Sequence, residues 1–148
     1  MSFIEVKSFA KINLALNVTG KSRLLHKIES IVSFISLCDL ILIKKIKGPD
    51  HQISFYGNFS KNIDTNNTVV KLFKILDEKK LLKDEKFQIR IKKNIPQKAG
   101  LGGGSMNASS VLNFLIKKKI VKISQKQIQN ISSLIGSDVI LGINHSSA

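Results

Sequence analysis

The sequence predicts an α+β domain from two kinds of pattern. Runs in which apolar and polar side chains alternate, typical of strands, fill most of residues 3–57 and return at 86–92. Segments whose apolar residues recur three and four positions apart, typical of helices, occupy 67–82, 105–119 and 124–135. At 148 residues and 43% hydrophobic content, the chain is long enough to bury a core and leaves little room for a second domain.

The first strands are expected near the N-terminus. Residues 3–18 alternate around a break near Ser8 and predict two strands or one long bent strand. Residues 27–35 and 40–46 predict two further strands, with a corner at 37–39 between them.

Two turns and two more strands follow. The stretch 20–26 predicts a turn. Gly48-Pro49-Asp50 is a strong turn signal before a short strand at 51–57, which favours a hairpin with the preceding strand. Residues 86–92 alternate cleanly, so we expect these side chains on one face of a strand: Phe87, Ile89 and Ile91.

Polar residues mark the ends of two helices. Asn66-Asn67-Thr68 can cap the first helix, which we expect to run to about Leu82. Ser124 and Gln127 have the spacing of a capping box at the start of another, and Gly136 ends it.

The remaining helix is expected to begin at Ser105, directly after a glycine-rich loop. Its basic tract at 117–119 suits the negative end of the helix dipole. The segment 137–148 begins like a strand.

The charge raises the question of an anionic partner. The net charge is +14, but only two of the 24 basic residues, Arg23 and Arg90, are arginine, whereas base and phosphate readout favours the arginine fork. With no tryptophan and one tyrosine, there is little aromatic surface for base stacking. We therefore expect a solvated lysine-rich surface and keep a nucleic-acid-binding module only as the weaker alternative.

Membrane insertion and export are not expected. The longest apolar run, 37–43, is interrupted by Asp39 and falls well short of the roughly 20 residues that span a bilayer. Charge enters from Glu5 onward, unlike a signal peptide. Because the single Cys38 permits no internal disulfide, we expect a soluble cytoplasmic protein with no membrane partner.

The loop from Pro96 to Ser105 is the segment most informative about chemistry. It carries three consecutive glycines between a predicted strand and a predicted helix, so the amides of the first helical turn can face a ligand. It has neither the Walker G-x4-G-K-[ST] pattern nor the spacing of a dinucleotide fingerprint. We predict an anion-binding cradle; a glycine-rich turn that only connects two elements is the alternative.

Three motifs, in order, resemble the GHMP small-molecule kinases. Residues 10–18 (AKINLALNV) resemble the family's opening strand, 93–109 (KNIPQKAGLGGGSMNAS) its ATP loop, and 135–139 (IGSDV) its late G-x-D-V motif. The resemblance implies that 1–148 form the family's N-terminal domain. The implied fold is like domain 2 of ribosomal protein S5, with a mixed, mostly antiparallel sheet packed on helices. The family's C-terminal half is absent, so a separate chain would have to supply it.

The resemblance also implies an activity. It points to the branch of the family that transfers phosphate from ATP to a hydroxyl of a cytidine-diphosphate-linked methylerythritol in non-mevalonate isoprenoid biosynthesis. Asp138 matches the family's catalytic base and Lys11 the lysine that orients the hydroxyl. Taken without the resemblance, Lys11 is typical of a strand surface and Asp138 of a helix cap or turn. Ser105, at the helix start, would reach a phosphate or Mg²⁺.

The implied binding residues fall in two groups. Asn13 and His26 would hold the cytidine end of the substrate, His26 by hydrogen bonds to the cytosine, although Leu25 precedes it where the family has an aromatic residue. The residues implied to wrap ATP are Pro96, Gln97, Lys98, Ala99, Gly100, Leu101, Gly102, Gly103, Gly104, Ser105 and Met106. Two further alternatives remain at this point: a non-catalytic remnant of such a kinase, and a sister kinase acting on another alcohol.

Overall fold

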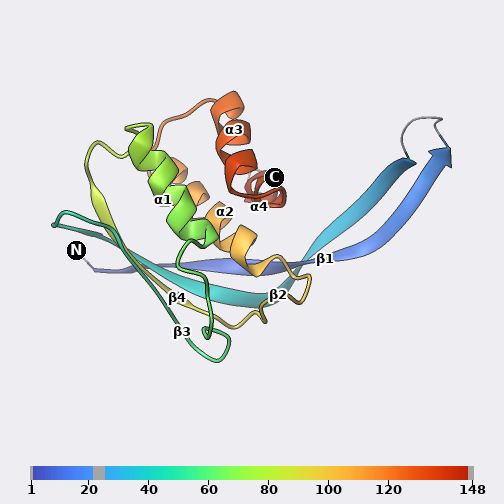
Figure 1. The fold of residues 1–148 in the computed structure, drawn as a ribbon, viewed down its shortest axis with the longest axis horizontal. Helices are drawn as coiled ribbons and strands as arrows, with labels where there is room; N and C mark the ends of the chain where they lie inside the picture. Colours follow the sequence, from blue (N-terminus) through green and yellow to red (C-terminus); the bar gives the residue numbers. More distant parts are fainter. Residues whose placement is uncertain (1, 22–25, 147–148) are drawn as a thin grey trace.

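The computed structural model describes residues 2–21 and 26–146, and the side chains of 2–13 and 32–143. The strands in this part of the chain are β1 (Ile4–Lys21), β2 (His26–Ile46), β3 (Gln52–Tyr56) and β4 (Lys86–Lys92). The helices are α1 (Thr68–Glu78), α2 (Gly103–Lys117), α3 (Gln125–Ile135) and α4 (Val139–Ser146). The predicted α+β class is confirmed, with the helices on one face of a mixed, mostly antiparallel sheet (Figure 1).

The strand order β1-β2-β4-β3 corrects the predicted hairpin. β4 lies between β2 and β3, pairing antiparallel with β2 and parallel with β3. The parallel pair arises because α1 forms the crossover that connects β3 to β4. The more apolar strand takes the inner position: Phe87, Ile89 and Ile91 of β4 are at most 2% exposed, whereas β3 alternates exposed and half-buried residues, as an edge strand does.

β1 is one long strand, which decides between the two predicted alternatives. Its register with β2 shifts between Phe9 and Lys11, close to the expected break. Figure 1 shows β1 and β2 continuing together as a two-stranded arm beyond the helices. The predicted turn at 20–26 falls mainly on 22–25, outside the described residues.

The corner predicted at 37–39 is wrong, because β2 continues through it. Asp39 lies within the predicted corner, but its side chain is fully buried and accepts hydrogen bonds from the backbone N–H groups of Asn94 and Ile95. A polar residue inside a strand therefore marks a buried contact here rather than a turn.

The core lies between the helices and the inner face of the sheet. Ile41 and Ile43 of β2 lie beside the apolar side chains of β4 on the same face of the sheet, and α1 and α2 cover them. The helical side of the core consists mainly of Val69, Leu72, Phe73, Leu76, Ala108, Val111, Leu112 and Leu115, each at most 2% exposed. The predicted helix periodicity is confirmed at these positions.

The helix ends follow the local polar residues. Asn67 caps α1 by accepting a hydrogen bond from Val70 N, although α1 ends at Glu78, before the predicted Leu82. The capping box of Ser124 and Gln127 is present at the start of α3. Gly136 ends α3, and α2 begins at Gly103, two residues before the predicted start.

The strand-like start of the last segment is wrong, because residues 139–146 form α4. Val139 and Ile143 lie one turn apart and are at most 5% exposed, as helix positions i and i+4 on one buried face. Packing of this face outweighs the strand preference of the β-branched residues, since tertiary contacts override local propensity.

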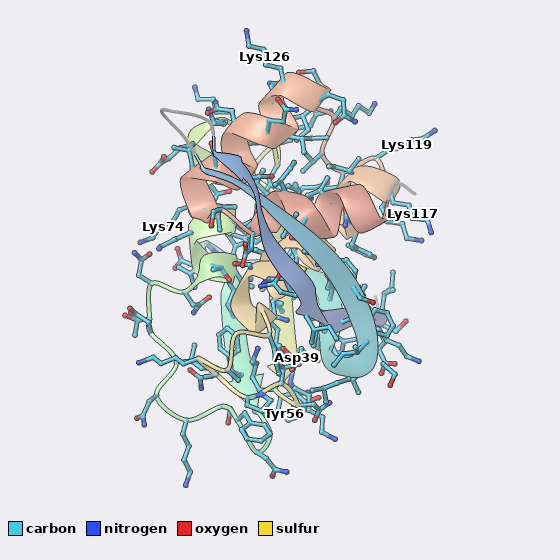
Figure 2. The ribbon with its side chains drawn as sticks, turned by 90° about the vertical axis from the view of Figure 1, so that its right-hand side faces the viewer. Asp39, Tyr56, Lys74, Lys117, Lys119 and Lys126 are labelled. Atoms are coloured by element: carbon cyan, nitrogen blue, oxygen red, sulfur yellow. The ribbon has the colours of Figure 1, made fainter. Side chains whose placement is uncertain are left out.

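The surface is basic. Figure 2 shows Lys74, Lys117, Lys119 and Lys126 directed outward from the helices, while Asp39 lies inside. In the part of the chain that the structure describes, no helix combines the length and the apolar character that crossing a membrane requires.

Candidate active site

The glycine-rich loop leaves β4 and ends at the N-terminus of α2. Gly102 is the N-cap residue of α2 and adopts the left-handed conformation, with φ of 66°. No side chain caps this helix end, so the amides of its first turn are available to a ligand. The positive end of the helix dipole lies behind these amides, which is the geometry that an anion-binding cradle requires, so the predicted cradle stays a prediction.

A hollow of about 390 Å³ lies inside this loop and is called the loop hollow below. Every residue from Pro96 to Ser105 lines it. Its far wall comes from β3 and the segment leading into α1, through Phe55, Ile63, Asp64 and Asn67. A cradle with an apolar wall at one end suits a ligand that has a charged part and a flat apolar part.

Lys11 of β1 is packed directly against the cradle. Its backbone N–H donates to Leu101 O at 3.0 Å. A Cβ atom at Gly102 would lie 2.8 Å from Lys11 Cε and 2.9 Å from Cγ, so only glycine leaves room for the lysine. The lysine side chain is therefore held in place by the loop beside it.

The two predicted catalytic residues lie together, although they are far apart in the sequence. Lys11 Nζ is 3.3 Å from Asp138 Oδ2, and the side chains are 7% and 42% exposed. A buried ammonium and a half-exposed carboxylate therefore meet next to the start of α2. Such a pair can orient a hydroxyl and accept its proton.

Ser105 lines the loop hollow and also lies near the turn that leads to Asp138. It belongs to the first turn of α2, and its Oγ lies 3.6 Å from the position of a Cβ at Gly136, in the turn that leads to Asp138. Its hydroxyl thus faces the segment that carries the carboxylate. In the described residues there is no group of three or more His, Cys, Asp or Glu side chains that could hold a metal ion by themselves.

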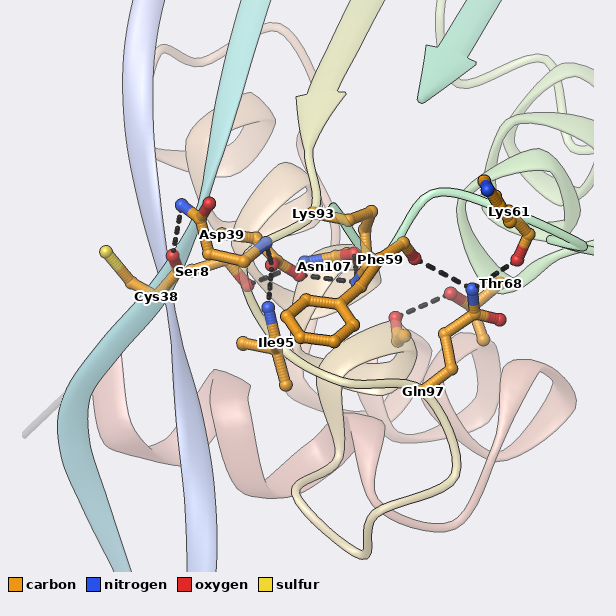
Figure 3. Close-up of polar contacts among 12 residues, drawn as sticks. Ser8, Cys38, Asp39, Phe59, Lys61, Thr68, Lys93, Ile95, Gln97 and Asn107 are labelled. Atoms are coloured by element: carbon orange, nitrogen blue, oxygen red, sulfur yellow. Dashed lines mark hydrogen bonds and ion pairs between the residues drawn. The ribbon is translucent and has the colours of Figure 1, made fainter. Parts of the chain in front are cut away.

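A buried polar network supports the cradle from below, and sequence reasoning missed it. Lys93 Nζ donates to Asp39 Oδ2 at 2.5 Å and to Asn107 Oδ1 at 2.9 Å, and Asn107 Nδ2 donates to Ser8 Oγ and Asp39 Oδ2, each at 3.0 Å (Figure 3). The four side chains are at most 5% exposed. They connect β1, β2, α2 and the start of the loop.

One signal in the sequence could have revealed this network. Asp39 interrupts an apolar run, and Lys93 follows a cleanly alternating strand at a position where the pattern expects an apolar residue. Two opposite charges at core positions usually pair when buried. Nothing in the sequence alone says that they face one another.

Two side-chain contacts hold neighbouring segments onto the loop. Gln97 Nε2 donates to the carbonyls of Phe59 and Lys61, and Thr68 Oγ1 donates to Gly104 O (Figure 3). The side-chain amide of Gln97 therefore donates its hydrogen bonds to the segment that forms the wall of the loop hollow. The hydrogen bond of Thr68 connects the start of α1 to the start of α2.

Three predicted site residues remain, and the structure describes the side chains of two of them, Met106 and Asn13. Met106 is 2% exposed and lines a second hollow, between β1 and α2, instead of the loop hollow. Asn13 is exposed on β1, two residues beyond Lys11 and on the same face of the strand. His26 begins β2, but its side chain is outside the described ones.

The fold and this site together define a small-molecule kinase domain. The family described as GHMP kinases N terminal domain matches residues 67–148. The chain belongs to the GHMP kinase family, and the described part has the fold of its N-terminal domain.

Two relatives show which members of the GHMP kinase family this chain resembles. A 4-diphosphocytidyl-2-C-methyl-D-erythritol kinase from Pelagibacter ubique is 59% identical over 148 residues, which is 100% of this chain and 53% of that protein. The kinase of the same name from Clostridioides difficile is 36% identical over 140 residues, or 94% of this chain and 47% of that one.

Solved structures agree on the fold. A crystal structure of 4-(cytidine 5'-diphospho)-2C-methyl-D-erythritol kinase superposes with a TM-score of 0.70 at 23% identity, covering 96% of this chain and 49% of that one. A mevalonate kinase from Methanococcus jannaschii superposes with a TM-score of 0.61. The chain spans about half the length of the curated relatives it matches.

Proposed function

We propose that this chain is the nucleotide-binding half of a 4-diphosphocytidyl-2-C-methyl-D-erythritol kinase. It transfers the γ-phosphoryl group of ATP to the 2-hydroxyl of the cytidine-diphosphate-linked substrate. The observation that carries the proposal is the Lys11–Asp138 pair, 3.3 Å apart, beside an uncapped helix N-terminus. The 59% identity to the Pelagibacter ubique kinase over the whole chain supports the same assignment.

The loop hollow supports ATP as the phosphoryl donor. The first-turn amides of α2 donate to the phosphates, while Phe55 and Ile63 offer an apolar wall for the base. In this arrangement Gly102 to Ser105 hold the β- and γ-phosphates. The side chain of Gln97 acts indirectly, by keeping the wall of the hollow attached to the loop.

The catalytic pair supports an in-line transfer. The substrate hydroxyl, held near Lys11, gives its proton to a carboxylate oxygen of Asp138 as its oxygen bonds to the γ-phosphorus. The bond between that phosphorus and the β–γ bridging oxygen breaks, and ADP leaves with the electron pair. Lys11 is rigid because the loop packs against it, so it orients the hydroxyl without a large loss of side-chain freedom.

The donor set also fits Mg²⁺. Magnesium is usually held by one or two carboxylates together with substrate phosphates and waters, and the Asp138 carboxylate and the Ser105 hydroxyl would supply the protein's oxygen ligands. A bound Mg²⁺ would supply positive charge opposite the phosphates. The cytidine end of the substrate is assigned to Asn13 and His26 by resemblance.

The proposal extends to the partner and the location. The half of the family's length that lies outside residues 1–148 closes the active-site cleft, and the protein works in the cytoplasm. This part of the proposal rests on the relatives, which are about twice as long.

Two measurements test the function. The first is a thermal melt of the chain with and without Mg·ATP, since a ligand at 100 times its dissociation constant adds about 2.7 kcal/mol of stability. The second is ADP release with the cytidine-linked substrate, for the chain alone and with the C-terminal half of the Pelagibacter ubique relative added. Asp138→Asn is the test variant and Asp50→Asn, on an exposed turn, is the control.

We expect Mg·ATP to raise the melting temperature and ADP release to depend on both the substrate and Asp138. Turnover that survives Asp138→Asn would contradict the mechanism. A melt unaffected by Mg·ATP would leave a non-catalytic remnant as the better description. RNA or DNA binding that persists at physiological salt after the glycine loop is disrupted would favour a nucleic-acid module.

A further inference from the structure

A single buried hydroxyl connects the cradle to the segment that carries Asp138. Ser109 Oγ lies 2.9 Å from Ser105 O and 2.5 Å from Val139 O, and the residue is 1% exposed. Because a serine hydroxyl has one proton, it donates to these two carbonyls alternately or shares the proton between them. Ser105 belongs to the first turn of α2, and Val139 directly follows Asp138.

A glycine on α4 makes this contact possible. A Cβ atom at Gly142 would lie 2.5 Å from Ser109 Cβ, 2.6 Å from its Oγ and 3.0 Å from Met106 Sδ. Real Cβ atoms essentially never approach that closely, so any other residue would push α4 away from α2. The backbone of α4 therefore rests directly on the α2 surface that continues from the cradle.

The two members of the catalytic pair are held in different ways. Lys11 is joined to the cradle by its backbone hydrogen bond to Leu101 and by its packing on Gly102. Asp138 lies on a turn, and its carbonyl accepts a hydrogen bond from Leu141 N, within the same segment. Its position relative to the cradle thus depends on how α4 sits on α2.

Side chains of α2 make polar contacts with the backbone of α4 in the part of the chain that the structure describes. Besides Ser109, Asn113 of α2 donates to Gly142 O, at the longer distance of 3.3 Å. The ion pair with Lys11 involves a carboxylate that is 42% exposed, and so it is partly screened by water. Of these bonds from Ser109 and Asn113, the buried Ser109–Val139 bond is the shorter and the nearer to Asp138.

We propose that Ser109 and Gly142 are positioning residues for phosphoryl transfer. Together they set the separation between the Asp138 carboxylate and the phosphate cradle, without touching nucleotide or substrate. The inference rests on the proposed function. It predicts an effect on the rate of transfer and little effect on nucleotide affinity, because the cradle amides belong to α2 and the loop and remain where they are.

The test compares the chain with Ser109→Ala, which removes the hydroxyl, and Gly142→Ala, which introduces the clash. Ser109→Gly and the double variant Ser109→Gly/Gly142→Ala form a size-exchange pair, because removing the Ser109 side chain makes room for the new methyl group. Ser132→Ala is the matched control. Ser132 is also 1% exposed, and its Oγ has no hydrogen-bond partner among the described residues.

Each variant is measured in three ways, at a temperature where its melt shows it folded. Titration calorimetry gives the dissociation constant for Mg·ATP, ADP release gives kcat under the conditions that support turnover of the unmodified chain, and a crystal structure gives the distance from Lys11 Nζ to the Asp138 carboxylate. A misplacement of about 1 Å is worth about 100-fold in rate. We therefore expect kcat to fall by about 10- to 100-fold in Ser109→Ala and Gly142→Ala, with the dissociation constant within about twofold.

In those two variants the Lys11–Asp138 distance should exceed the 3.3 Å of the unmodified chain. The double variant should recover the kcat of Ser109→Gly, and Ser132→Ala should behave as the unmodified chain does. A purely structural role would lower the melting temperature without this division between kcat and affinity.

The outcomes separate this inference from the proposed function. If the unmodified chain turns over and Ser109→Ala retains its kcat, the positioning role is wrong and the function stands. If the unmodified chain shows no turnover with or without the added C-terminal half, the proposed function fails. The crystal structures then decide the positioning role: a Lys11–Asp138 distance unchanged in Ser109→Ala and Gly142→Ala would overturn it, and a longer one would support it.

Discussion

The backbone N–H of Lys11 donates to the carbonyl of Leu101 at 3.0 Å, so strand β1 and the glycine loop are joined through their main chains. The side chain of the same lysine then runs along Gly102 toward Asp138. The loop proposed to hold the ligand is thereby also the surface on which the lysine side chain packs. Substitutions in the loop should therefore change the position of Lys11 relative to Asp138, and the first two predictions follow from this.

Gly102→Ala should destabilise the chain by about 1–3 kcal/mol, because it combines a strained left-handed backbone with displacement of Lys11. The measurement is the free energy of unfolding by urea. Gly104→Ala is the matched control: it lies two residues on, within α2, where a Cβ would have only ordinary contacts at 3.6 Å or more. An equal loss in both variants would show that Lys11 does not depend on Gly102.

Lys11→Met should lower the rate of ADP release by about 100- to 1,000-fold, since it removes the charge that lies beside the reacting hydroxyl and keeps the length of the side chain. Steady-state kinetics with the cytidine-linked substrate provide the measurement. Lys7→Met, at an exposed position of the same strand, should leave the rate unchanged. A similar rate for Lys11→Met and the unmodified chain would rule out its role in transfer.

Lys93→Met should cost about 3–5 kcal/mol of unfolding free energy, because it leaves the fully buried Asp39 carboxylate without its partner. Lys45→Met is the comparison. Lys45 Nζ is 2.8 Å from Glu85 Oε1, but the two side chains are 45% and 34% exposed, so breaking this pair should cost less than about 1 kcal/mol. Both values come from chemical denaturation. Comparable losses would mean that burial does not govern the strength of these pairs.

Ser124→Ala should destabilise α3 by about 1 kcal/mol, because it removes the side-chain half of the capping box. Ser133→Ala, on the exposed side of the same helix, should change the unfolding free energy by less than about 0.5 kcal/mol. Equilibrium unfolding monitored by circular dichroism measures both. A neutral Ser124→Ala would indicate that packing of the apolar face alone sets where the helix begins.

Local patterns predicted the elements whose ends and faces are set by neighbours in sequence. The capping residues Asn67 and Ser124 lie where the sequence expects them, because a cap is a contact across three or four residues. The alternation in β4 likewise identified its buried face. The glycine loop was found because an uncapped helix start needs no distant partner to be recognised.

Apart from shifts of a few residues at the ends of α1 and α2, the failures involve contacts between distant segments. β3 pairs with β4 rather than with β2, and α4 is a helix because its face packs on α2. The residues that neighbour these segments in the sequence determine neither contact. The meeting of Lys11 with Asp138 was expected only through resemblance to a family. The pairing of Asp39 with Lys93 across 54 positions was not expected at all.

That buried pair has a consequence for how the molecule comes apart. Asp39, Lys93, Asn107 and Ser8 belong to four segments spread over most of the chain, and if any one segment leaves, at least one of the other side chains loses a buried partner. The loop begins at this network, so it takes its shape only after the sheet and α2 have docked. A local opening of the loop alone would expose the buried charges of Asp39 and Lys93. Formation of the loop is thus coupled to the docking of α2 on the sheet: the segment proposed to hold the nucleotide takes its shape only when the four segments are together.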